Sequence, residues 1–79
     1  MQLNIFSLKG IDYQGEIKSL TAKTLAGEIT ILNHHRPLIS ILKSGSLRII
    51  DLAGIKNDIQ VTSGFLEVSP DNTVNILLD

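Results

Sequence analysis

Apolar and polar residues alternate along most of this chain. Leu47 and Ile49 flank Arg48, and the same spacing recurs at 66–68 and 74–76. A period of two is typical of strands with one buried face and one exposed face. The inward positions predict an interior of thirteen residues: Leu3, Ile5, Ile17, Leu20, Ile29, Ile31, Leu47, Ile49, Val61, Leu66, Val68, Val74 and Ile76.

Turn-forming residues divide the chain into short segments and leave no room for a long helix. They are Gly10, Gly15, Gly27, Pro37, Gly45, Gly54, Gly64 and Pro70. Fifteen Ile and Val residues against three Ala also favour strands. We therefore expect one all-β domain over residues 1–79, a small antiparallel β-sandwich or flattened barrel of about eight to ten short strands.

Two segments depart from simple alternation. Residues 16–26 have near-helical apolar spacing, but their threonines favour an irregular or bulged strand. Residues 38–42 are almost wholly apolar and predict a strand buried on both faces. Ser44, Gly45 and Ser46 are typical of a hairpin turn.

Composition excludes several classes of function. A net charge of −1 gives no basic surface for nucleic acid, so we expect no nucleic-acid partner. No apolar stretch approaches the ~20 residues that cross a bilayer, and no signal peptide is evident, so direct membrane insertion is not expected. The absence of cysteine excludes disulfides and thiolate metal sites.

The densest polar cluster is Asn33-His34-His35-Arg36, directly before Pro37. Adjacent histidines on an extended chain point to opposite faces, so they would not bind one metal ion together. No nucleophile-base pair and no phosphate-binding loop is present elsewhere, so we expect no catalytic residue, metal, cofactor or nucleotide. The alternative is a small β-sandwich enzyme or ligand-binding module with its site at Asn33–Arg36, which requires a concave pocket there.

Six short motifs together resemble the N-terminal domain of the epsilon subunit of rotary F-type ATP synthases, over the whole chain. They are Tyr-Gln-Gly-Glu at 13–16, Ala-Gly-Glu at 26–28, His-His-Arg-Pro-Leu at 34–38, Leu-Lys-Ser-Gly-Ser-Leu-Arg-Ile at 42–49, Ser-Gly-Phe-Leu-Glu-Val at 63–68 and Val-Asn-Ile-Leu-Leu-Asp at 74–79. Three positions depart from the family pattern. His34 replaces a usual Gly, Ser44 a usual Pro and Ala26 a frequent acid.

The resemblance implies a subunit that is not itself an enzyme. It would couple the gamma subunit to the c ring in the central stalk of a proton-translocating ATP synthase. Its location would be peripheral, on the cytoplasmic face of a bacterial plasma membrane or the equivalent face of an organelle membrane. By position, Ser7, His35 and Ser40 would contact gamma, and the 26–28 turn (Ala26, Gly27 and Glu28) would contact the c ring.

The family often continues into two C-terminal helices, which can block hydrolysis and in some members bind ATP. No residue follows Asp79 in this sequence. The resemblance therefore implies a chain that couples rotation without inhibiting hydrolysis.

Overall fold

Eight strands and the turns between them make up the computed structural model, which describes all 79 residues. The structure contains no helix long and apolar enough to cross a membrane. The strands are β1 (Gln2–Ser7), β2 (Gly10–Thr24), β3 (Gly27–Leu32), β4 (Leu38–Leu42), β5 (Gly45–Asp51), β6 (Lys56–Val61), β7 (Gly64–Ser69) and β8 (Thr73–Leu78).

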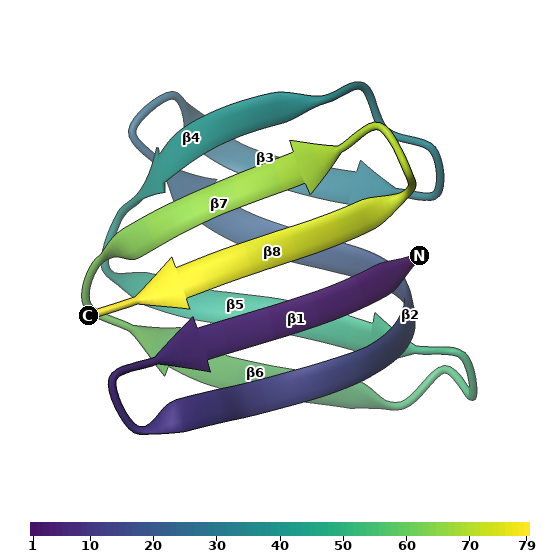
Figure 1. Ribbon diagram of the computed structural model, residues 1–79, viewed down its shortest axis with the longest axis horizontal. Coiled ribbons are helices and arrows are strands. Elements are labelled where there is room, and N and C mark those ends of the chain that lie inside the picture. The colour runs from purple at the N-terminus through teal and green to yellow at the C-terminus, as the bar shows by residue number, and fades with distance from the viewer.

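The strands form two layers (Figure 1). In the front layer of Figure 1 the strands lie in the order β4, β7, β8, β1. On its other side β1 pairs with the first half of β2. The second layer contains β3, the rest of β2, β5 and β6. All pairs are antiparallel except β1 and β8, which run parallel. The all-β sandwich predicted from the sequence is confirmed.

β2 belongs to both layers. Its first half pairs with β1, and its second half pairs with β3 on one side and β5 on the other. The register with β5 shifts between Ile17 and Ser19, where the strand crosses between layers. A single bridge between Thr24 and Leu42 joins the end of β2 to β4 and closes the sheet into a flattened barrel. The bulged strand predicted over 16–26 is confirmed for residues 16–24, but it begins earlier, at Gly10, and Leu25 and Ala26 belong to the turn that follows it.

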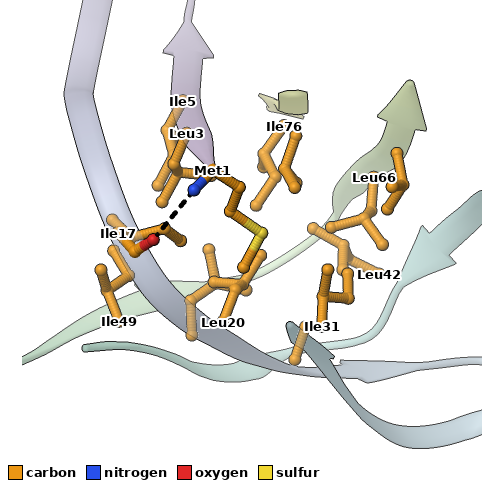
Figure 2. Close-up of a cluster of buried hydrophobic side chains, with 14 of the residues drawn as sticks. Met1, Leu3, Ile5, Ile17, Leu20, Ile31, Leu42, Ile49, Leu66 and Ile76 are labelled. Atoms are coloured by element: carbon orange, nitrogen blue, oxygen red, sulfur yellow. Dashed lines mark hydrogen bonds between the residues drawn. The ribbon is translucent and has the colours of Figure 1, made fainter. Parts of the chain in front are cut away.

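The interior lies between the layers and follows the predicted alternation. Of the thirteen predicted residues twelve are buried, and Ile29 is partly buried and packs against them. Met1, Ala22 and Leu42 complete the cluster. Figure 2 shows the Met1 side chain within it, between Ile76 of the front layer and Leu20 of the second.

Two local predictions are wrong. Residues 38–42 are buried on one face only: Ile39 is 77% exposed because no layer covers the outer side of β4. Residues 44–46 do not form a hairpin, because β4 pairs with β7 while β5 pairs with β2 and β6. The chain at Ser44 instead crosses from the front layer to the second.

Candidate functional site

The three residues that the resemblance places near gamma lie apart. Ser7 ends β1, and its hydroxyl donates to Asp12 Oδ1 at 3.2 Å. His35 lies in the β3–β4 loop, where its Nδ1 is 2.7 Å from the carbonyl oxygen of Arg36. Ser40 is half-buried in the middle of β4. The β3–β4 loop is beside the start of β1, so a strand length of roughly 20 Å separates Ser7 from His35 (Figure 1). The structure does not join these residues into one patch, and their contact with gamma stays a prediction.

The residues predicted to face the c ring lie together in the 26–28 turn, at the exposed tip between β2 and β3. Buried Thr24 fixes this tip, because its hydroxyl donates to the Gly27 carbonyl at 2.8 Å and accepts from the Ala26 amide at 3.1 Å. Gly27 has a φ of 114°, in the region that favours glycine. The turn therefore presents Glu28 from a fixed backbone, while its contact with a ring stays a prediction.

Basic side chains surround Glu28. Two grooves of about 310 and 530 Å³ share Lys23 and Glu28, and no hydrophobic residue lines either of them. Lys43 lines the larger groove, and Arg48 lines the smaller one. Glu28 is the single acid in either groove, so a ligand at this end meets one carboxylate among several cations.

An apolar row crosses the outer face of the front layer. The register of the sheet places five side chains directly opposite one another, one on each strand: Ile41, Phe65, Leu77, Phe6 and Ile11. Four of them are 46% to 60% exposed, and Phe6 is half-buried. Ile39 is a further exposed apolar residue on this face, beside Ile41 in β4. A contiguous apolar surface of this kind is typical of a surface that contacts another protein.

A polar row lies beside the apolar row and is internally hydrogen bonded. It consists of Glu67, Asn75, Asn4 and Gln14, which oppose one another in the next register position. Asn75 donates to Glu67 at 3.2 Å, Asn4 donates to Asn75 at 3.0 Å and Gln14 donates to Asn4 at 3.2 Å. These amides hold four strands in register, so the face is rigid next to its apolar row.

The Asn33–Arg36 cluster lines no pocket. The third groove, of about 390 Å³, begins at Pro37 and lies between β4 and β7. Asn33 Oδ1 instead accepts hydrogen bonds from the Met1 ammonium group and from Asn72. No group of three or more His, Asp or Glu side chains is placed to hold a metal ion. A catalytic or ligand site at these residues therefore has no support in the geometry.

The apolar row was missed because it depends on register between strands that are distant in sequence. Phe65 and Leu77 each follow a buried position in an alternating strand and are apolar where a polar residue is expected. That excess of apolar residues on the outward positions is the signal that could have identified the surface.

The whole chain, residues 1–79, matches the family described as ATP synthase, Delta/Epsilon chain, beta-sandwich domain. It is 37% identical to an ATP synthase epsilon chain of Acinetobacter baumannii and 42% identical to one of Psychrobacter arcticus, each over 79 residues. These alignments cover 100% of this chain and 56% of each relative. The chain thus spans little more than half the length of the curated relatives that it matches.

Two solved structures share the fold. A chain in the Euglena gracilis mitochondrial ATP synthase, OSCP/F1/c-ring, has a TM-score of 0.90 and 23% identity, covering 96% of this chain and 48% of that one. A chain in the Tetrahymena thermophila mitochondrial ATP synthase, central stalk/c-ring, has a TM-score of 0.82 and 24% identity, covering 99% and 62%. From the match over all 79 residues and the identity to epsilon chains, the chain belongs to the family of ATP synthase delta/epsilon β-sandwich domains.

Proposed function

We propose that this chain is a rotor subunit in the central stalk of a proton-translocating F-type ATP synthase, where it couples gamma to the c ring. The observation that carries the proposal is the 37% to 42% identity to ATP synthase epsilon chains over every residue of the chain. The solved neighbours occur in assemblies described as F1/c-ring and central stalk/c-ring. We further propose that the subunit is non-catalytic and works on the cytoplasmic face of a bacterial plasma membrane, or the equivalent face of an organelle membrane.

The fold suits a part that transmits torque. A coupler must resist shear, and strands that share backbone hydrogen bonds resist it better than loops do. Of the 47 backbone hydrogen bonds, 39 lie within the strands. β2 runs without a break through both layers, so a load on one layer passes along a covalent chain to the other.

Two surfaces are available for two partners. The apolar row has the chemistry of a permanent contact with a folded protein, and we assign it to gamma. The 26–28 turn is polar and charged, and we assign it to the polar loops of the c ring. Ser7, His35 and Ser40 lie outside the apolar row, so their contact with gamma is a separate proposal that rests on the resemblance alone.

The test is to assemble the synthase with and without this chain in proteoliposomes, and to measure protons pumped per ATP hydrolysed. We expect the ratio to fall when the chain is omitted and to recover when it is added back. An unchanged ratio, with gamma and the c ring present in both preparations, would contradict the coupling role.

A further inference from the structure

The crossover from β4 to β5 lies directly beside the 26–28 turn. Two backbone hydrogen bonds flank the single bridge that joins β2 to β4. In one the Leu25 amide donates to the Ile41 carbonyl at 3.1 Å, and in the other the Lys43 amide donates to the Lys23 carbonyl at 2.9 Å. Both segments lie at the left end of Figure 1. The turn and the crossover therefore form one surface, held together by backbone hydrogen bonds.

The larger groove beside Glu28 spans this junction. The turn lines it on one side, and Lys43 and Ser44 of the crossover line it on the other. Lys23 lies opposite Glu28 in the β2–β3 pair. Its side chain crosses Gly45 so closely that a Cβ at Gly45 would lie 2.9 Å from Lys23 Cδ and 3.6 Å from Lys23 Nζ. The missing side chain of Gly45 thus leaves room for the Lys23 ammonium group to approach the crossover.

The charged groups of this groove form no ion pair within the chain. Both ion pairs of the structure join other residues, and Lys23, Lys43 and Glu28 are all exposed. The groove therefore carries two cations against one anion, in a chain whose net charge is −1. A surface with this balance is complementary to a partner that presents a carboxylate.

We propose that Lys23 and Lys43 form, together with Glu28, one docking surface for a polar loop of the c ring, and that this loop presents a carboxylate to the two lysines. The inference rests on the proposed function, which assigns only the 26–28 turn to the ring. Glu28 repels a second acid, so it restricts the positions in which the loop can bind. An anionic membrane suits the groove less well, because the same Glu28 carboxylate repels lipid phosphates.

Zero-length cross-linking of the assembled synthase tests the contact directly. A carbodiimide joins a lysine amine to a carboxylate that touches it, and mass spectrometry identifies the joined residues. We expect isopeptide bonds from Lys23 or Lys43 to an Asp or Glu of a c subunit. The double variant Lys23→Arg with Lys43→Arg keeps both charges but has no amine to couple, so it should lose the product and keep its ratio of protons pumped per ATP. The proposal would be overturned if the unsubstituted chain gave no such product, as when the lysines meet lipid phosphates, or if the lysines were joined to gamma alone.

Charge reversal separates this inference from the proposed function. The chain is titrated back into synthase that lacks it, and the concentration that half restores protons pumped per ATP is measured. Lys43→Glu should raise this concentration about ten-fold or more at low salt and less at high salt, because salt screens an exposed contact between charges. Lys56→Glu is the matched control and should stay within about two-fold of the unsubstituted chain, because exposed Lys56 lies opposite Ile50 at the far end of β5.

The two ways in which the titration can fail are distinguishable. If the unsubstituted chain restores coupling and Lys43→Glu behaves like Lys56→Glu, the docking surface is wrong and the proposed function stands. If the unsubstituted chain restores no coupling, the proposed function fails and the docking surface fails with it.

Discussion

His34 and Asn72 share the same left-handed backbone conformation and are joined to each other. Their φ angles are 61° and 62°, and the His34 amide donates to Asn72 Oδ1 at 2.7 Å. The link ties the β3–β4 loop to the β7–β8 turn. It also explains why the family pattern has Gly where this chain has His34, since glycine adopts this conformation without strain.

The pair predicts opposite results for the same substitution. His34→Gly should raise the free energy of unfolding by about 1 kcal/mol, because it relieves the left-handed strain and removes no side-chain hydrogen bond. Asn72→Gly relieves less strain and deletes the acceptor of the 2.7 Å bond, so it should lower that free energy. Urea unfolding of both variants measures the two changes. A destabilised His34→Gly variant would contradict this account of the loop.

Gly64 should tolerate no side chain. A Cβ at this position would lie 2.3 Å from the Leu77 carbonyl oxygen, which belongs to the neighbouring strand and cannot move aside. Gly64→Ala should cost roughly 1 to 3 kcal/mol or more in unfolding free energy, as overpacking does. Gly15→Ala is the control, because its Cβ meets nothing closer than 3.9 Å. Thermal unfolding of the two variants should separate them clearly.

Inward and outward isoleucines of the strands should differ in how much their truncation to Ala lowers stability. Ile49→Ala empties a site that is fully buried and should cost roughly 2 to 4 kcal/mol. Ile39→Ala removes a side chain that is 77% exposed and should change stability by no more than about 0.5 kcal/mol. Chemical denaturation measures both. A large loss at Ile39 would indicate that the outer side of β4 is covered in the isolated chain.

Removal of an apolar side chain from the apolar row should weaken gamma binding without unfolding the domain. Phe65 is 53% exposed on β7 of the front layer, so Phe65→Ser should leave the circular dichroism spectrum intact while lowering affinity for gamma at least ten-fold. Ile55→Ser is the matched control, because Ile55 is 60% exposed but lies in the β5–β6 loop outside the row. Isothermal titration with gamma compares them. Equal affinities of the two variants for gamma would show that gamma does not bind this face.

Charge reversal at Glu28 should lower coupling but not stability. Glu28→Lys removes the single acid of its two grooves and should reduce protons pumped per ATP, with a stability change within about 0.5 kcal/mol. Asp71→Lys, at the opposite end of the sandwich, is the control and should leave coupling unchanged. Because the chain has no cysteine, a single Cys at position 28 is also a unique cross-linking probe for a c-ring loop. Cross-links to the ring from a Cys at Ser7 or His35 alone would show that the assumed orientation is wrong.

The interior could be predicted well from the sequence, because burial on one face makes apolar residues alternate within each strand. This alternation can be recognised without knowing which strands pair. It failed at Ile39, because an apolar run does not reveal whether a second layer covers it. The 26–28 turn was foreseen only through the resemblance, since an exposed acid after Gly27 is common. The apolar row could not be predicted, because it depends on register between segments up to about 70 residues apart.

The parallel pairing of β1 with β8 brings the first strand of the chain beside its last, with Asn4 opposite Asn75. A chain emerging from the ribosome cannot complete this sheet until β8 has left the exit tunnel, so β1 remains unpaired on one edge until then. Proteins dominated by such long-range pairings fold in milliseconds to seconds rather than microseconds. The nascent chain therefore keeps the edge of β1 beside Leu3 and Ile5 unpaired until β8 emerges, and an unpaired strand edge promotes aggregation during that interval.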